Sequence, residues 1–265
     1  LRVFSEGSTE NSNPLFNIGT DSGGASDSVD IFVRGRNGTI NHPKSTIVAF
    51  DNTWHLITWT QSGNDVALYI DGVLDEIAIE MGVTPLINPE DDYRMDTTTI
   101  GGIRRATASH WWTGAIDEVA MWERALGADE VQRLFDEGIW SHFKEDPILE
   151  DIIAHWPLDE VNGSRTPELI NGYDMELVNL TADDLVEGKD GSAFLFDVER
   201  QTLLQRISDV GDELPANEQH DAWTVSMWVN GKGEGQNDLR VFSEGSTENS
   251  NPLFNIGTDS GGASD

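Results

Sequence analysis

The sequence has no cysteine, few basic side chains and no long apolar run, and each absence excludes a class of protein. Without cysteine there is no disulfide framework, no thiolate zinc site and no cysteine nucleophile. The 16 Lys and Arg residues stand against 48 Asp and Glu residues, so the formal net charge is −32 and a phosphate backbone would be repelled. The longest unbroken apolar run is Val66–Ile70, whereas a membrane-spanning helix needs roughly 20 apolar residues. The sequence therefore predicts no nucleic-acid partner and no membrane insertion.

The sequence is nevertheless rich in material for a packed core. Its 265 residues are 37% hydrophobic and include nine Trp and ten Phe, which excludes disorder as the main state and fits one or two domains. The strong acidity suits surroundings with salt or divalent cations, where self-repulsion is screened. We therefore expect an extracellular or cell-surface location.

One segment of the sequence occurs twice. Residues 1–27 reappear letter for letter as residues 239–265, at an offset of 238. Such an identity indicates a window, slightly longer than one period, cut from a tandem array. Any secretion signal would then belong to sequence outside this window. The alternative is an overlap on a single-copy protein, in which the two copies would compete for one structural position.

Short strands separated by turn residues fill most of the chain. Alternating or β-branched segments predict strands at 29–34, 55–60, 65–71, 73–79, 97–101, 114–122, 154–158, 193–198, 202–206, 223–229, 240–243 and 253–257. Asp71-Gly72 predicts a hairpin turn. A single helix is predicted at 128–137, with Gly138 placed to end it, and the apolar residues of 139–151 indicate a docked segment rather than a flexible tether. This pattern predicts a large all-β sandwich.

Several motifs resemble a known family. The laminin G-like domains of the concanavalin A-like jelly-roll class have second halves similar to T-W-H-L-I-T-W-T at 53–60, V-A-L-Y-I-D-G at 66–72, T-I-G-G at 99–102 and G-A-I-D-E-V at 114–119. Their first halves are similar to H-W-P-L-D-E at 155–160, G-S-A-F-L-F-D at 191–197 and W-T-V-S-M-W-V at 223–229. The resemblance implies a jelly-roll sandwich with one short C-terminal helix per repeat.

The order of these halves divides the chain. Residues 1–146 resemble the C-terminal part of one laminin G-like repeat, and residues 147–265 resemble the N-terminal part of the next. We expect residues 1–27 to pack with 28–146 and residues 239–265 to pack with 147–238. Each part then lacks its other half, which favours a linear head-to-tail assembly of neighbouring copies.

The sequence does not predict an enzyme. Retaining hydrolases with this sandwich need two carboxylates about 5 Å apart, usually in an E-x-D-x-x-E strand pattern, and that pattern is absent. The nearest approach, Glu76 to Glu80, reads as the solvent face of an edge strand. The six histidines are scattered singly, without the neighbours of a catalytic triad.

Calcium is the cofactor that the resemblance and the acidity indicate. In concanavalin A-like sandwiches a cation commonly ties the opening strand to the final one, and the similar positions here are Asp159 and Asp117, with Asn171 and Gly172 as turn contributors. Such hard cations take six to eight oxygen ligands. The alternative, that Asp117 and Glu118 only face water or hydrogen-bond a turn, stays open.

Glycan is the other ligand that we considered. Trp111 and Trp112 are adjacent in the sequence, so alternation would send one ring inward and the other outward, and we take Trp111 as a candidate sugar platform. It would equally serve as a rim aromatic that covers the core.

The leading hypothesis is a non-catalytic extracellular tandem-repeat protein, the structural unit of a surface fibre or large adhesin. The alternative is a glycan-binding module attached to a carbohydrate-active enzyme.

Overall fold

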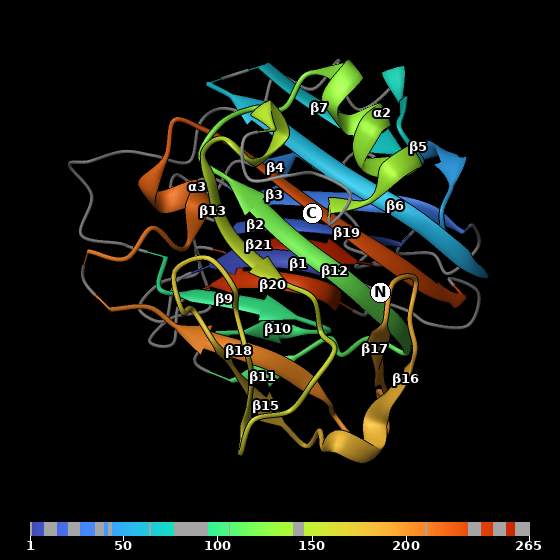
Figure 1. Cartoon of the computed structure of the whole chain (residues 1–265), viewed down its shortest axis with the longest axis vertical. Helices are drawn as coiled ribbons and strands as arrows, with labels where there is room; N and C mark the ends of the chain where they lie inside the picture. Colours follow the sequence, from blue (N-terminus) through green and yellow to red (C-terminus); the bar gives the residue numbers. More distant parts are fainter. Residues whose placement is uncertain are drawn as a thin grey trace.

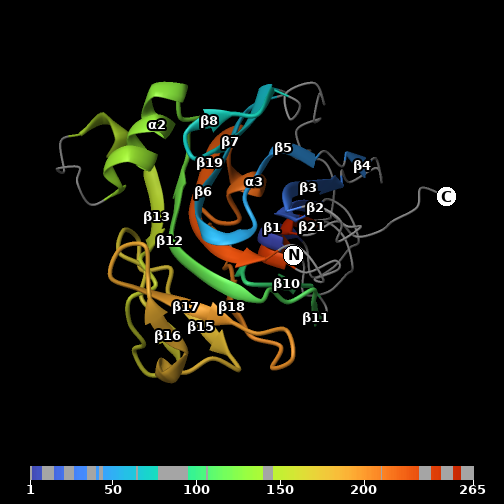
Figure 2. The same ribbon diagram turned by 90° about the vertical axis from the view of Figure 1, so that its right-hand side faces the viewer.

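The computed structural model describes twelve stretches of the chain: residues 2–7, 15–20, 27–34, 40–41, 44–63, 65–76, 95–105, 107–139, 146–209, 211–232, 240–245 and 253–257. Two large, mostly antiparallel sheets lie face to face in this part of the chain (Figures 1 and 2). The predicted all-β sandwich is therefore confirmed.

Sheet B, the eight-stranded sheet, carries the residues on which the functional argument depends. Its order is β16 (Leu185–Glu187), β17 (Ser192–Phe196), β12 (Gly114–Trp122), β19 (Ala222–Lys232), β6 (Asp51–Ser62), β7 (Asp65–Ile70) and β8 (Val73–Leu74), with β13 (Ile152–Trp156) also paired to β12.

Sheet A, the eleven-stranded sheet, contains both copies of the repeated segment. Its order is β14 (Arg165–Thr166), β15 (Met175–Val178), β18 (Leu203–Ile207), β9 (Thr97–Ile100), β1 (Arg2–Gly7), β21 (Leu253–Gly257), β20 (Arg240–Gly245), β2 (Leu15–Thr20), β3 (Ser28–Arg34) and β4 (Ile40–Asn41), with β5 (Lys44–Val48) paired to β3. A separate small ribbon joins β10 (Ile103–Arg104) to β11 (Ala108–Ser109).

Strands from both parts of the chain are interleaved in both sheets. In sheet B, β19 from the second part lies between β12 and β6 from the first. In sheet A, β18 from the second part pairs with β9 from the first. Residues 1–146 and 147–265 thus complete one sandwich together in this chain, whereas their assignment to successive repeats remains a prediction.

Aromatic side chains fill the space between the sheets. Trp59, Trp112, Trp156 and Trp223 are fully buried there. The ring of Phe16 lies 4.8 Å from that of Trp59 and 5.1 Å from that of Trp223, distances at which aromatic pairs attract beyond their burial. The repeated segment therefore supplies part of the central core.

A second apolar cluster lies between sheet B and α2 (Ala128–Glu137), which has the predicted bounds. Leu134 on α2 is buried in the cluster with Trp122 and Trp228 of the sheet. Gly138 has φ 71° and its N–H donates to the carbonyl of Leu134, as expected of a terminating glycine. Ile148, on the 3-10 helix Pro147–Leu149, is fully buried in the same cluster, and its carbonyl accepts from Trp122 Nε1 at 2.7 Å.

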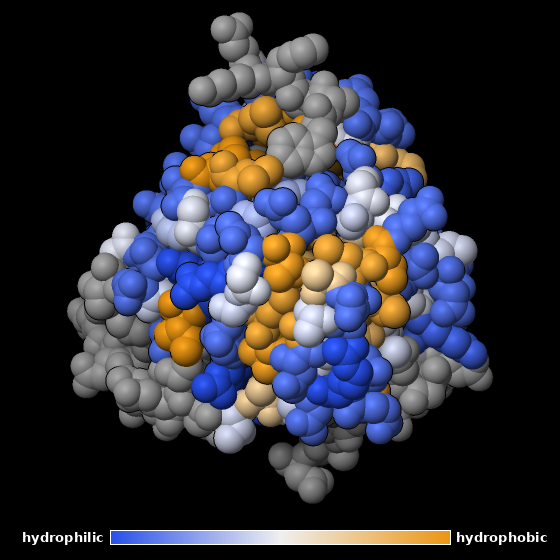
Figure 3. Space-filling view, turned by 60° about the horizontal axis from the view of Figure 1, so that its bottom comes forward, coloured by the Kyte–Doolittle hydropathy of each residue, from blue (hydrophilic) through white to orange (hydrophobic). Residues whose placement is uncertain are grey.

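The coloured part of the face shown in Figure 3 is largely hydrophilic, with separate hydrophobic patches. The other helices are short: α3 spans Ala216–Gln219, and a second 3-10 helix spans Ala182–Asp184. Within the described residues no helix has the length and apolar character needed to cross a membrane.

Within the predicted strand 73–79, the described residues 73–76 contain β8, Val73–Leu74, and residues 77–79 lie outside the described part of the chain. Asp75 ends the strand because its buried carboxylate turns to β5, where Oδ2 accepts from the N–H groups of Thr46 at 2.6 Å and Ile47 at 3.1 Å. Glu80 of the carboxylate pair considered above lies outside the described residues.

The predicted hairpin turn is present and holds a histidine. Asp71 and Gly72 both have positive φ, 52° and 78°, as a two-residue turn between twisted strands requires. Asp71 Oδ1 accepts from the Leu56 N–H at 2.8 Å, and Oδ2 lies 2.7 Å from His55 Nδ1. The hydrogen bond with Asp71 raises the pKa of His55, although burial opposes the rise.

This turn predicts a pH-dependent stability. Because the pKa of His55 is higher in the folded chain, its contribution is fully present below the unfolded pKa of about 6.5 and is lost as pH rises through the folded pKa. We expect His55→Gln to remove this component, on the order of 1 kcal/mol, from denaturant unfolding curves measured on both sides of that range. A variant with the same pH profile as the parent would contradict the assignment.

Candidate functional site

The candidate site is built on an irregularity in β12. Asp117 is opposite Trp228 and Ala120 is opposite Ser226, so Glu118 and Val119 together face a single residue of β19. Glu118 has φ 49°, a left-handed conformation that is uncommon for a residue other than glycine. This is a β-bulge, a feature that re-aims side chains next to functional sites.

The bulge aims the Asp117 carboxylate at the turn between β16 and β17. Oδ2 accepts from the N–H groups of Lys189 at 2.6 Å and Asp190 at 3.0 Å, and Oδ1 accepts from the N–H of Glu118 at 2.9 Å. Asp117 is fully buried. Burial raises the pKa of Asp117 to about 8, although these three backbone donors lower it. A nearby cation would offset the lost hydration of the ionised form.

Asp159 meets the same turn from the end of β13. Its Oδ1 accepts from the N–H of Ser192 at 2.6 Å. The turn is closed by a hydrogen bond from the Gly188 N–H to the Gly191 carbonyl at 3.1 Å. The two carboxylates that the sequence placed together are therefore brought to one five-residue segment, 188–192.

Asn171 and Gly172 belong to a different turn, one organised by Glu168. The Asn171 N–H donates to Glu168 Oε2 at 2.7 Å, and Asn171 Nδ2 donates to the Ile153 carbonyl at 2.9 Å. Gly172 has φ 75°, with open space where a Cβ would stand. The described contacts of these two residues thus serve the turn and not the Asp117 carboxylate.

The sequence analysis did not predict a buried network of hydrogen bonds beside the bulge. Glu118 Oε2 lies 2.8 Å from His155 Nε2, and both side chains are buried. The N–H of His155 in turn donates to Glu168 Oε1 at 2.7 Å. The sequence feature that could have indicated this network is Glu168, an acidic residue just ahead of the Asn171-Gly172 turn. Hydrogen bonding is what permits the burial of such polar groups.

A second carboxylate group includes His220. The ligand atoms of Glu123, Glu213 and His220 lie within 4.8 Å of one another. His220 Nδ1 lies 3.5 Å from Glu123 Oε2, and Nε2 lies 3.3 Å from Glu213 Oε2. The two ring nitrogens thus face different carboxylates, and Nε2 also lies 3.1 Å from the backbone carbonyl oxygen of Glu213.

The two adjacent tryptophans differ in burial. Trp112 is fully buried, and Trp111 is half-buried. Trp111 Nε1 is buried without a hydrogen-bond partner, and the ring packs beside Gly102. Part of the Trp111 ring is therefore covered by protein, and its role as a sugar platform stays a prediction.

Comparison with known proteins gives one family. Residues 2–132 match the laminin G family model described as the Concanavalin A-like lectin/glucanases superfamily, and residues 133–265 lie outside the matched range. The matched range is 131 of the 265 residues, just under half of the chain, and together with the antiparallel sandwich it shows that this part of the chain is similar to the concanavalin A-like lectin/glucanase superfamily. Neither the curated proteins nor the solved structures gave a match to the chain.

The turn around the two carboxylates predicts a position that only glycine fits. A Cβ on Gly191, which has φ 60°, would stand 2.2 Å from Asp159 Oδ1, whereas a Cβ on Gly163, which has φ 66°, would meet nothing within 4 Å. Since both residues have left-handed backbone, Gly163→Ala is the matched control. We expect Gly191→Ala to lower the unfolding free energy by about 1–3 kcal/mol more than Gly163→Ala does. Equal losses would show that Asp159 does not pack on the turn.

Proposed function

We propose that the chain is a non-catalytic, extracellular laminin G-like unit of a tandem-repeat protein, a surface fibre or large adhesin. The observation that supports it is the behaviour of the repeated segment. Both copies form a hairpin, β1 with β2 and β20 with β21, and both lie in sheet A between β9 and β3. We call this place the hairpin position.

The hairpin position accommodates only one copy at a time. A strand has two edges and therefore at most two neighbours in a sheet. Here β1 has pairings with β2, β9 and β21, and β2 has pairings with β1, β3, β20 and β21. Since β1 and β2 cannot make all of these pairings at once, we infer two alternative arrangements: in one the first copy lies between β9 and β3, and in the other the second copy does.

The two copies approach the same neighbours in the same sense. The first strand of each copy, β1 or β20, lies against β9, and the second strand, β2 or β21, lies against β3. The two copies pair with the same strands because their sequences are identical: the register of a hairpin is set by its side-chain pattern and turn length, which the copies share. A single sandwich therefore uses one copy of the repeated segment, and the chain contains a second copy.

A tandem array removes this surplus, because each copy then completes the sandwich of its own repeat. The same logic extends to neighbouring chains, where a spare hairpin of one copy would fill the hairpin position of the next in a head-to-tail manner. The partners we propose are therefore neighbouring copies of the same unit. The glycan-binding module of a carbohydrate-active enzyme is the alternative, which a catalytic domain next to this sequence would favour.

Paired substitutions test the equivalence of the two copies. Phe16 packs on Trp59 and Trp223, and Phe254 is its counterpart in the second copy. We expect Phe16→Ala or Phe254→Ala alone to cost little, because the unaltered copy can take the hairpin position. The double variant should lose roughly 3–5 kcal/mol of unfolding free energy in denaturant melts. A full loss in Phe16→Ala alone, with none in Phe254→Ala, would mean that the copies are not interchangeable.

We also propose that Asp117 and Asp159 hold Ca²⁺ against the segment 188–192. The supporting features are a buried carboxylate hydrogen-bonded by backbone N–H groups, a second carboxylate on the same turn and an acidic chain that gains from a divalent counter-ion. When bound, the ion would supply charge neutralisation, and the two side chains would tie β12 and the end of β13 to the β16–β17 turn. This role is structural.

Calcium titration tests this site. The melting temperature should rise with the logarithm of free calcium above its dissociation constant and fall in chelator. Asp117→Asn or, if that variant does not fold, Asp159→Asn should abolish the response. Asp183→Asn, at an exposed carboxylate on the Ala182–Asp184 helix, should keep it. A parent melting temperature that neither calcium nor chelator moves would remove the proposal.

A further inference from the structure

Three tripeptides of the sequence have the form Asn-X-Ser/Thr, which is the acceptor sequence for N-linked glycans. They begin at Asn37, Asn162 and Asn179. The tripeptide at Asn37 lies outside the described residues, so the structure compares the other two. Because so short a pattern also arises by chance, the local structure has to decide which asparagine is free to react.

The tripeptide at Asn179 is used by the fold. Asn179 Nδ2 donates to the carbonyl oxygens of Arg200 at 3.1 Å and Gln201 at 3.2 Å, so both of its hydrogens are engaged. The hydroxyl of Thr181, the third residue of the tripeptide, donates to Asp184 Oδ2 at 3.3 Å. A sugar on Asn179 Nδ2 would have to displace one of the two carbonyls, so this site is closed in the folded chain.

The tripeptide at Asn162 forms an exposed turn that the backbone alone holds. The Asn162 N–H donates to the Arg165 carbonyl at 2.7 Å, and the Arg165 N–H donates to the Asn162 carbonyl at 3.2 Å. Gly163 and Ser164, the two residues between them, are exposed, as is Asn162 itself. Among the described residues no group hydrogen-bonds to the Asn162 amide or the Ser164 hydroxyl. The turn therefore leaves both groups of the acceptor sequence accessible to an enzyme.

Two further features of this turn favour its modification. It leads into β14, the end strand of sheet A, which pairs with β15 at the lower end of the sheet in Figure 1. Glu160, two positions before Asn162, is exposed. Bacterial oligosaccharyltransferases select an acidic side chain at this position, where it pairs with a basic site on the enzyme. The corresponding residue before Asn179 is Leu177.

We propose that Asn162 is an N-glycosylation site. Asn162 Nδ2 attacks the anomeric carbon of a lipid-linked oligosaccharide. The new C–N bond replaces the C–O bond to the lipid pyrophosphate, which leaves while the amide gives up one proton. The glycan would cover the open edge at β14, whose backbone groups could otherwise pair with another chain. The proposal rests on the extracellular location of the proposed function, because this transfer takes place outside the cytosol.

Transfer in vitro to the folded full chain tests the proposal. The chain is incubated with a bacterial oligosaccharyltransferase that requires the acidic residue and with its lipid-linked oligosaccharide, and intact mass and peptide mapping report the modified positions. We expect one glycan, on Asn162. Asn162→Gln should abolish the transfer, and Glu160→Gln should slow it by about tenfold or more. Asn179→Gln, which changes the same residue type in the closed tripeptide, should leave it unchanged.

Two controls separate the turn from its sequence and from the repeat assembly. A synthetic peptide of residues 158–166 should accept the glycan, which shows that the enzyme reads this sequence. Because the assay contains purified components only, its result does not depend on location or on association between copies. No transfer to the folded chain, transfer to the peptide alone, or transfer that survives Asn162→Gln would overturn the proposal.

Discussion

A β-strand has only two edges, and in this chain that constraint decides how the repeated segment can be used. Sheet A needs one hairpin to connect β9 with β3, and the sequence supplies two. Without a hairpin, β9 and β3 would each expose a row of backbone donors and acceptors, and the Trp59–Trp223 region would lose Phe16. The core and the pairing of sheet A therefore depend on which copy fills the hairpin position, and so would the proposed association with neighbouring units.

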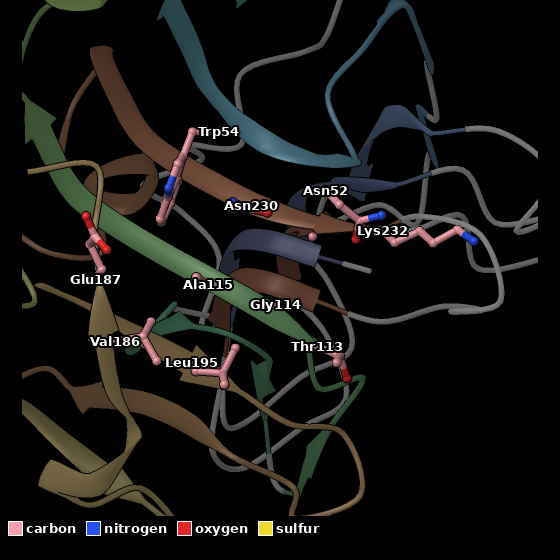
Figure 4. Close-up of a pocket in the computed structure, with 11 residues that line it drawn as sticks. Asn52, Trp54, Thr113, Gly114, Ala115, Val186, Glu187, Leu195, Asn230 and Lys232 are labelled. Carbon is pink, nitrogen blue, oxygen red and sulfur yellow. The ribbon is translucent and has the colours of Figure 1, made fainter.

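Sheet B carries the carboxylate site and a groove (Figure 4). Its central strand β12 contributes to both: the bulge at Glu118 turns Asp117 toward the segment 188–192, and the regular pairing before the bulge places Ala115 in the groove. A carboxylate site and a groove that Glu187 and Lys232 also line thus lie within a few residues of each other on one strand. The carboxylate site would reinforce the domain.

Much of the fold was predictable because local signals agree with the final structure. The bounds of α2 follow from the apolar spacing of Val131 and Leu134 and from Gly138, and the β7–β8 turn follows from Asp71-Gly72. Strands β15 and β16 were missed because each has four residues or fewer and is fixed by its partner rather than by its own pattern. The convergence of Asp117 and Asp159 was predicted through a family resemblance. The role of Glu168 was not predicted, since its carboxylate acts by accepting hydrogen bonds from backbone N–H groups.

Disulfide trapping tests most directly whether both copies use the same position. Glu6 on β1 is opposite Thr98 on β9, Glu244 is the counterpart of Glu6 in the second copy, and the chain has no cysteine of its own. Two double variants, Thr98→Cys with Glu6→Cys and Thr98→Cys with Glu244→Cys, are oxidised under mild conditions at low protein concentration. Interchangeable copies predict that both pairs form disulfides in comparable yield. A disulfide in only one of the two variants would show that one copy alone fits between β9 and β3, and would contradict the account.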